Sequence, residues 1–170
     1  AKMCMDSKGE AFESLQESEK ACMRARDLTQ QLLTFARGGQ PLKKLSSIAE
    51  IVKESAVFAL SGSKASSVFS LPDDLWAAEV DAGQISQVIN NIVMNADEAM
   101  PNGGKISISA SNSVIKGEKA IPLPRGNYVI IVIQDNGIGI PKEYLSKVFD
   151  PYFTTRQKGS GLGLTTSYSI

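Results

Sequence analysis

Residues 84–100, QISQVINNIVMNADEAM, constrain the fold of this chain more than any other stretch. Its apolar residues recur three or four positions apart, at Ile85, Val88, Ile89, Ile92, Val93 and Ala96. This spacing is typical of an amphipathic helix with one face in a core. Asn91 and Asn95 lie four apart at the edge of the apolar stripe, so their amides stand one above the other on the helix. Such amides can hold a hydrated cation or a polar ligand, or simply face water.

The same helix carries its own start and stop signals. Asp81, with Gln84 three residues later, is typical of a helix N-terminus, and the run Asn102-Gly103-Gly104 predicts its end. Glu98 lies one turn beyond Asn95, and we expect its carboxylate to face water.

Composition excludes several classes of function. The 170 residues include 18 Lys and Arg, 18 Asp and Glu, and no histidine. A balanced charge does not favour nucleic acid or an anionic membrane as a partner, and no apolar run approaches the roughly 18 residues of a membrane span. The lack of histidine excludes Ser-His-Asp catalysis and histidine metal ligands within this chain. Cys4 and Cys22 lack metal-ligand spacing, which favours a reduced, cytoplasmic setting.

The chain is predicted to divide near residue 39. Residues 10–36 form one long helix in this interpretation, because their apolar positions recur every three, four or seven residues. Gly38-Gly39 would cap that helix and Pro41 would stop it. A single helix of this kind has no core of its own. We therefore interpret residues 1–39 as part of a helical hairpin that dimerises, and residues 40–170 as a separate α/β domain.

The second part alternates short helical and strand patterns. We predict a helix at 48–60, short strands at 68–71 and 76–80 around a Pro72-Asp73-Asp74 turn, and strands at 105–114 and 128–134 joined by a hairpin loop at 116–126. The run YVIIVIQ at 128–134 is almost continuously apolar, which predicts a central strand. The irregular order favours the α+β class, with an antiparallel or mixed sheet covered by helices on one face.

Two polar segments rich in glycine follow this strand. Asp135-Asn-Gly-Ile-Gly-Ile-Pro141 combines a hydrogen-bonding carboxylate with bare backbone that a ligand can approach closely. Residues 148–164, VFDPYFTTRQKGSGLGL, end in a glycine-rich turn that opens a predicted helix at 162–170, which is a pattern able to cradle an anion. The spacing matches neither a Walker loop nor a Rossmann fingerprint. Taken alone, each segment is equally well explained as a turn or a flexible loop.

Taken in order, these segments resemble one family. Asn91 and Asn95 resemble the N box, DNGIGIP the G1 box, FDPYFTT the F box and GSGLGL the G2 box of sensor histidine kinases. The wider superfamily includes gyrase, the heat-shock 90 chaperone and mismatch-repair ATPases, and the NADEAM and DPYFTT variants resemble the nitrogen-regulatory kinases. The resemblance implies a two-layer α/β sandwich of the Bergerat type, with ATP and Mg²⁺ bound in it.

The resemblance also implies roles for individual residues. Asn95 would hold Mg²⁺ on the ATP phosphates, and Asn91 would be a second amide ligand or a phosphate contact. Asp135 would read the adenine amino group. Gly137 and Gly139 would let the base dock. The remaining implied ATP contacts are Ile140, Phe149, Thr155, Lys158, Gly159, Ser160, Gly161, Leu162, Gly163 and Leu164.

Two departures from the family pattern lead us to expect a fragment of a longer kinase. The phosphoacceptor histidine is absent, and the chain stops at Ile170, before the strand that normally follows the lid. The parent would form a homodimer through the hairpin and pass phosphate to a response-regulator receiver domain. One alternative is an ATP-hydrolysing relative, but those proteins carry Glu where this chain has Asn91. A second alternative is a non-catalytic dimerisation module.

Overall fold

The computed structural model describes residue 18 and residues 41–117, 123–156 and 159–170. The chain divides into two compact units, Ala1–Gly39 and Gln40–Ile170, and the second contains every helix and strand named below. The predicted helix at 10–36, and with it the predicted dimerising hairpin, lies outside the described residues.

Helices α2 and α3 each begin at a residue whose side chain caps the helix. Helix α2 spans Ile48–Ala59, and the Ser47 hydroxyl accepts a hydrogen bond from the Glu50 amide at its start. Helix α3 spans Ala82–Glu98, and the Asp81 carboxylate accepts hydrogen bonds from the Gly83 and Gln84 amides. Helix α4 spans Gly163–Ser169, and a short 3-10 turn, η2, covers Lys142–Tyr144. The predicted helices at 48–60, 84–100 and 162–170 are thus confirmed to within about two residues.

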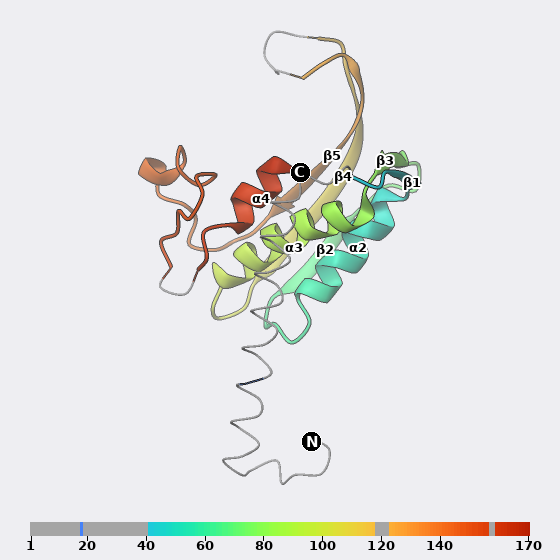
Figure 1. Ribbon diagram of the computed structural model, residues 1–170. Helices are drawn as coiled ribbons and strands as arrows, with labels where there is room; N and C mark the ends of the chain where they lie inside the picture. Colours follow the sequence, from blue (N-terminus) through green and yellow to red (C-terminus); the bar gives the residue numbers. More distant parts are fainter. Residues whose placement is uncertain (1–17, 19–40, 118–122, 157–158) are drawn as a thin grey trace. The chain divides into compact units, whose positions relative to one another are not determined.

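Strands of both orientations make up the sheets. Strands β2 (Ser66–Ser70), β4 (Lys105–Ile115) and β5 (Gly126–Gln134) form one sheet in the order β2-β4-β5. Strand β4 runs parallel to β2 and antiparallel to β5, so the sheet is mixed. Helices α2, α3 and α4 lie on one face of this sheet (Figure 1). The predicted α+β class, with a mixed sheet and helices on one face, is confirmed.

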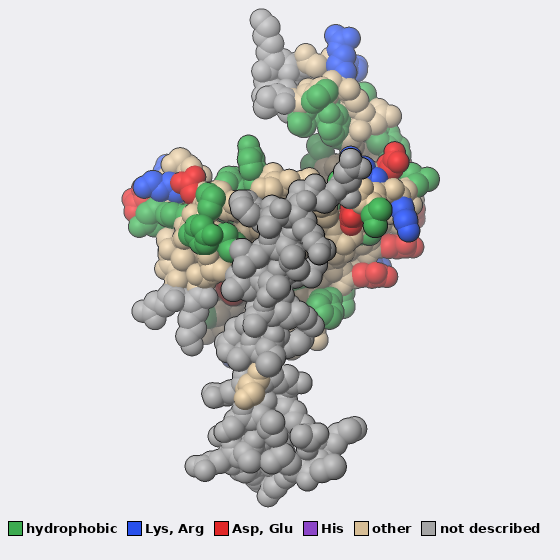
Figure 2. Space-filling view, in the orientation of Figure 1, with side chains coloured by type: hydrophobic (Ala, Val, Ile, Leu, Met, Phe, Trp, Pro, Cys, Tyr) green, Lys and Arg blue, Asp and Glu red, His purple; other side chains and the backbone are tan. Residues whose placement is uncertain are grey.

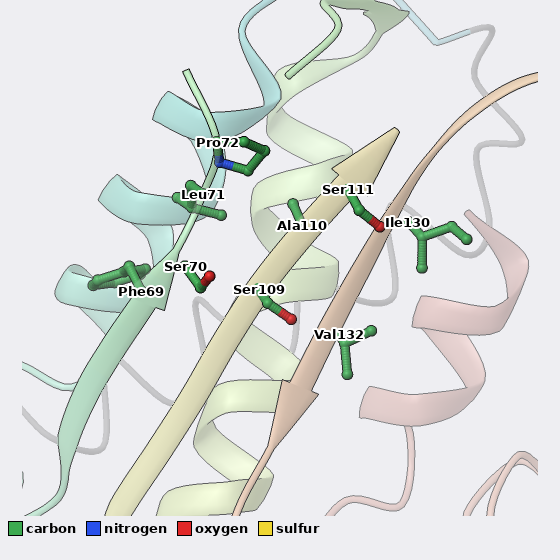
Figure 3. A pocket seen from close by; sticks show the side chains of 9 residues that line it. All are labelled: Phe69, Ser70, Leu71, Pro72, Ser109, Ala110, Ser111, Ile130 and Val132. Atoms are coloured by element: carbon green, nitrogen blue, oxygen red, sulfur yellow. The ribbon is translucent and has the colours of Figure 1, made fainter. Parts of the chain in front are cut away.

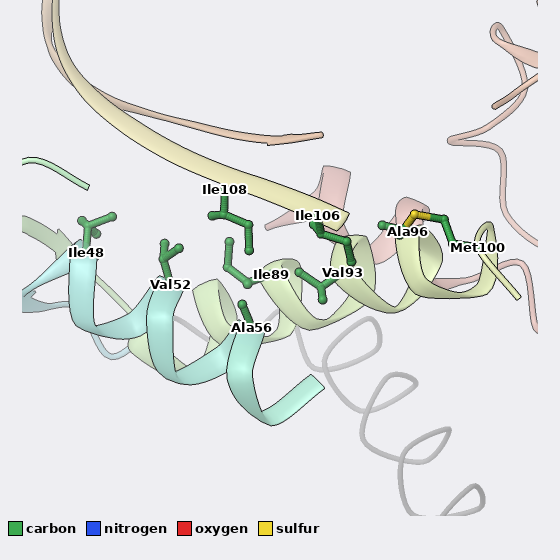
Figure 4. Packing of buried hydrophobic residues seen from close by; sticks show 9 residues of the cluster. All are labelled: Ile48, Val52, Ala56, Ile89, Val93, Ala96, Met100, Ile106 and Ile108. Carbon is green, nitrogen blue, oxygen red and sulfur yellow. The ribbon is translucent and has the colours of Figure 1, made fainter. Parts of the chain in front are cut away.

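The core lies between this sheet and the two longer helices. It is built from nine buried residues, Ile48, Val52, Ala56, Ile89, Val93, Ala96, Met100, Ile106 and Ile108 (Figure 4). Ile89, Val93 and Ala96 belong to the apolar stripe of residues 84–100. That stripe therefore positions α3 against β4, and it leaves the Asn91 and Asn95 side of the helix free of the core.

The prediction that residues 128–134 form a central strand is wrong for the described part of the sheet. Strand β4 occupies the middle, and β5 pairs only with β4 there. Side chains alternate between the two faces of a strand. Ile131 and Ile133 accordingly pack against the core, whereas Ile130 and Val132 are 43% and 49% exposed. The continuous apolar run of β5 therefore contains residues of two kinds: those that face the core and those that are exposed on the other face of the sheet.

The two short strands before α3 lie close to the predicted ranges 68–71 and 76–80. The first is β2, and residues 78–80 form β3, which does not pair with β2. It pairs antiparallel with β1 (Lys44–Ser46), a strand that the sequence did not predict. The Leu42 amide donates to the Asp81 carboxylate at 2.9 Å, which ties β1 to the start of α3. This contact spans 39 residues and has no local sequence signal.

A hollow of about 470 Å³ lies on the sheet (Figure 3). Its lining is Phe69, Ser70, Leu71, Pro72, Ser109, Ala110, Ser111, Ile130 and Val132. Ile130 and Val132 point away from the helices, and none of the predicted site residues lines this hollow. It is thus separate from the candidate site.

Candidate functional site

The C-terminal half of α3 carries the first part of the candidate site. Asn95 is half-buried, and its side-chain oxygen accepts a hydrogen bond from Arg156 Nη1 at 3.1 Å. Arg156 Nη2 donates to the Asn95 backbone carbonyl, also at 3.1 Å. The same guanidinium forms an ion pair with Glu98. The expectation that Glu98 only faces water is therefore wrong, because its carboxylate is paired although the side chain remains 52% exposed.

Asn91 joins α3 to the last helix. Its amide nitrogen donates to the Gly163 carbonyl at 3.0 Å and to the Ser167 hydroxyl at 3.2 Å. Because a side-chain amide has its nitrogen and its oxygen on opposite sides, these two hydrogen bonds fix which way the oxygen points. Asn91 thus contributes first to the packing of α4, and its oxygen is the group that remains to meet a cation.

The turn after β5 packs directly on the end of α3. The Asp135 carboxylate accepts from the Gly137 amide at 2.8 Å, and the Ile138 amide donates to the Ala99 carbonyl at 3.2 Å. Gly137 is required by space, since a Cβ there would lie 2.6 Å from the Ala99 Cβ. Gly139 is required by conformation, since its φ is 72° and the space around it is open. This turn therefore presents open backbone beside the helix that carries Asn95.

The glycine-rich segment, residues 159–163, is bonded to a residue with an unusual backbone conformation. Tyr152 has φ of 64°, in the left-handed region that side chains rarely adopt, and its amide donates to the Gly161 carbonyl at 3.0 Å. A Cβ on Gly161 would lie 2.6 Å from the Tyr152 carbonyl oxygen, so glycine is needed at this position. The Leu162 amide donates to the Ser160 hydroxyl at 3.4 Å just before α4 begins. The loop is thus anchored at the F-box side and at α4.

The remaining predicted residues fall into three groups. Phe149 stacks on Tyr168 with ring centroids 5.2 Å apart, and its carbonyl accepts from the Thr165 hydroxyl, so it supports α4. Ile140, Thr155 and Gly159 are exposed, whereas Leu162 and Leu164 are half-buried beside α4. Lys158 lies outside the described residues.

No large surface of a single charge surrounds the site in the view of Figure 2. Acidic and basic side chains are interspersed over the described surface seen in Figure 2. Within the described residues no group of three or more His, Cys, Asp and Glu side chains could hold a metal ion. A cation here would depend on neutral amide oxygens together with oxygens of the ligand, which is the mode that Mg²⁺ uses with phosphates. The Asn95 oxygen fits that use, because it already accepts from a cationic group.

Three further residues contribute to the site. Arg156, which the sequence offered only as a positive charge near the glycine-rich turn, contacts Asn95 and Glu98, at least 58 positions earlier in the chain. Ala99 packs against Gly137, and Thr165 donates to the Phe149 carbonyl; neither of these two was predicted. Ala99 and Thr165 look like ordinary helix residues until the fold places them.

Comparison with known proteins agrees with this geometry. A family model described as histidine kinase-, DNA gyrase B-, and HSP90-like ATPase matches residues 80–170. The curated relatives include sensor kinase CckA of Brucella abortus, 32% identical over 94% of this chain and 18% of that protein. Sporulation kinase E of Bacillus subtilis is 36% identical over 59% of this chain and 12% of that protein. The chain thus spans less than a fifth of the length of either relative.

Solved structures show the same fold. The catalytic domain of histidine kinase ThkA superposes with a TM-score of 0.58 at 28% identity, over 75% of this chain and 78% of that one. Full-length ShkA in complex with AMPPNP gives a TM-score of 0.70 at 18% identity, over 95% of this chain and 34% of that one. The residues at 80–170 therefore form an ATP-binding domain of the kind found in sensor histidine kinases. The chain belongs to the family of histidine kinase-, DNA gyrase B- and HSP90-like ATPases.

Within the described residues, no helix is long and apolar enough to cross a membrane.

Proposed function

We propose that this chain is the ATP-binding core of a sensor histidine kinase. It would bind Mg-ATP and transfer the γ-phosphoryl group to a histidine on a helix of the dimerising hairpin, and from there to a response-regulator aspartate. The acceptor belongs to another segment or chain, because this chain contains no histidine. The chemistry would take place in the cytoplasm, where ATP is available.

One observation carries the proposal. Four segments, namely α3 and three later stretches of the chain, meet along the C-terminal half of α3: Asn91 touches Gly163, Asn95 touches Arg156, and Ala99 touches both Gly137 and Ile138. Phosphoryl transfer requires mainly positioning and charge neutralisation from the protein. The meeting point offers amide oxygens, a guanidinium and open glycine backbone, which are suited to those two tasks.

Each group has a task in this proposal. Asp135 is held by the Gly137 amide and would accept a hydrogen bond from the adenine amino group. Bound Mg²⁺ would neutralise phosphate charge, and the side-chain oxygens of Asn95 and Asn91 would hold it. The Gly159–Gly163 backbone would donate to the phosphates and exclude water from them. These residues position and shield the γ-phosphate without forming a covalent bond to it.

The contacts on α3 favour transfer over hydrolysis. An amide such as Asn91 cannot remove a proton from water, and its nitrogen is already bonded to α4. Asp97, the first carboxylate after Asn95, accepts from the Ser63 hydroxyl at 2.5 Å. Neither Asn91 nor Asp97 therefore stands ready as a general base. A non-catalytic dimerisation module is the other alternative. Such a module would not need these four segments to meet at α3.

Nucleotide titration tests the binding step. We expect Mg-ATP to raise the melting temperature of the wild-type chain, because a ligand at about 100 times its Kd adds about 2.7 kcal/mol to the stability of the folded state. Asn95→Ala should remove the part of this shift that depends on Mg²⁺. Asn127→Ala is the matched control, since Asn127 is exposed at the opposite end of β5 from Asp135. A wild-type melting temperature that does not respond to ATP would refute nucleotide binding.

The transfer step needs a longer protein. A form extended on the N-terminal side of Ala1 to include the hairpin should acquire acid-labile phosphate on a histidine when given Mg-ATP. Acid-stable label, or no label from a protein that binds ATP, would contradict the kinase assignment while leaving ATP binding intact.

A further inference from the structure

Arg156 is hydrogen-bonded to the Asn95 side-chain oxygen, which is the atom that would bind the metal in the proposed function. Its Nη1 donates to the Asn95 side-chain oxygen and its Nη2 to the Asn95 backbone carbonyl. The planar guanidinium therefore binds this residue through two hydrogen bonds at once. The Asn95 carbonyl also accepts from the Ala99 amide at 3.1 Å, near the C-terminus of α3. A cation is favoured there by the helix dipole.

A second cation cannot join the same oxygen without cost. Magnesium ligands lie about 2.1 Å from the ion, and a guanidinium nitrogen that stays bonded to the same oxygen would bring two positive charges within a few ångströms of each other. Mg²⁺ binding at Asn95 therefore requires Arg156 to leave. Arg156 lies three residues before Gly159, whose amide donates to the Arg156 carbonyl at 3.4 Å. Movement of Arg156 would thus be transmitted to the glycine-rich segment.

Glu98 decides how firmly Arg156 is held. Its carboxylate is the anionic partner of the guanidinium, and both side chains are partly exposed, at 52% and 39%. An ion pair of this exposure is weak, so it can open when a stronger cation arrives. The pair is therefore suited to hold Arg156 on Asn95 without locking it there.

We propose that Arg156 and Glu98 form an exchangeable latch on Asn95: the guanidinium occupies the metal-binding oxygen in the nucleotide-free protein, and Mg-ATP displaces it, which releases the glycine-rich segment. Both are positioning residues, since they act through Asn95. The inference rests on the proposed function, because it requires Asn95 to be a metal ligand.

Titration calorimetry of the 170-residue chain with ATP, in the presence of Mg²⁺ or of EDTA, tests the latch. Glu98→Gln weakens the grip of Arg156, so we expect the affinity for ATP with Mg²⁺ to rise about two- to five-fold, the range expected for loss of an exposed ion pair. The gain should be smaller in EDTA. In an Arg156→Gln background, Glu98→Gln should have no effect, because the latch is already absent.

The matched control is Glu79→Gln, which makes the same charge change on β3, at the other end of α3. It should leave both affinities unchanged. If Glu98→Gln acted only by removing a negative charge near ATP, the affinity would rise at least as much in EDTA as with Mg²⁺, so an equal or larger gain in EDTA would overturn the latch. An unchanged or lower affinity with Mg²⁺, as expected of a carboxylate that assists the metal, would overturn it too. The same holds for an effect of Glu98→Gln that persists in the Arg156→Gln background.

These outcomes are separate from the proposed function. If the wild-type chain binds no ATP in either condition, the proposed function itself fails. If it binds ATP in a manner that depends on Mg²⁺ but Glu98→Gln gives one of the contrary results, only the latch fails.

Discussion

Gly137→Ala is expected to damage the nucleotide site through packing alone. The added Cβ would lie 2.6 Å from the Ala99 Cβ, 2.8 Å from the Ala99 carbonyl oxygen and 2.8 Å from the Asp135 carboxylate. Carbon atoms in contact are normally about 3.5–4.0 Å apart, so the turn and the end of α3 must separate by about 1 Å. The Ala99 atoms belong to the backbone or to Cβ, so no flexible side chain can move aside.

The magnitude follows from the cost of overpacking, about 1–3 kcal/mol. If the turn stays in place, this strain lowers the stability of the fold, and the melting temperature falls by about 3 °C for each kcal/mol. If the turn relaxes by moving off α3, ATP must return it to its place, and the same strain raises Kd by about 5- to 150-fold. The loss of folding free energy and the loss of ATP-binding free energy should together equal the free energy of the strain.

Thermal unfolding and ATP titration of the same samples measure both losses. Ala99→Gly in the Gly137→Ala background removes the closest contact and should restore part of what was lost. Gly62→Ala is the control, because Gly62 has φ of 81° with nothing within 4 Å of the added Cβ. It should cost about 1–2 kcal/mol of stability from backbone strain, with unchanged ATP affinity. A Gly137→Ala protein with wild-type melting temperature and wild-type Kd would show that this turn does not pack on α3.

Two further predictions concern the frame that holds the site. Hydrogen bonds from the Gln84 and Leu42 amides, with a lesser one from Gly83, outweigh the opposing effect of desolvation and lower the pKa of the Asp81 carboxyl below its ordinary value of 3.8. The stability that Asp81 contributes as an anion is therefore present above pH 3.8 and is lost as the pH falls through its lowered pKa in the folded protein. Denaturant unfolding of Asp81→Asn, which keeps a capping side chain, should lack this pH dependence; equal pH profiles would contradict it. In the core, Ile106→Ala should cost about 2–5 kcal/mol because Ile106 is fully buried, whereas Ile138→Ala should cost little because Ile138 is 89% exposed. Chemical denaturation compares the two, and similar losses would refute the assignment of the core to the helix-facing side of the sheet.

Most helices and strands of the described residues could be predicted from the sequence. The three- and four-residue spacing of Ile89, Val93 and Ala96 is enough to define a helix with one buried face, because this periodicity belongs to the helix itself. Asp81 marks the start of that helix by the hydrogen bonds that its carboxylate accepts. The Asn pair, the Asp135 turn and the glycine-rich segment could be recognised in the same way, since each is a short run whose residue types carry the signal.

Which of these groups lie together depends on the packing of whole elements. The ion pair of Arg156 with Glu98, the packing of Gly137 on Ala99 and the pairing of β1 with β3 join residues 32 to 58 positions apart. The edge position of β5 likewise depends on which strand lies beside it, so an apolar run could not reveal it. Such contacts arise from the way whole elements pack, and no local pattern encodes them. Asn95 could therefore be singled out as a candidate from the sequence, but its contact with Arg156 could be found only in the fold.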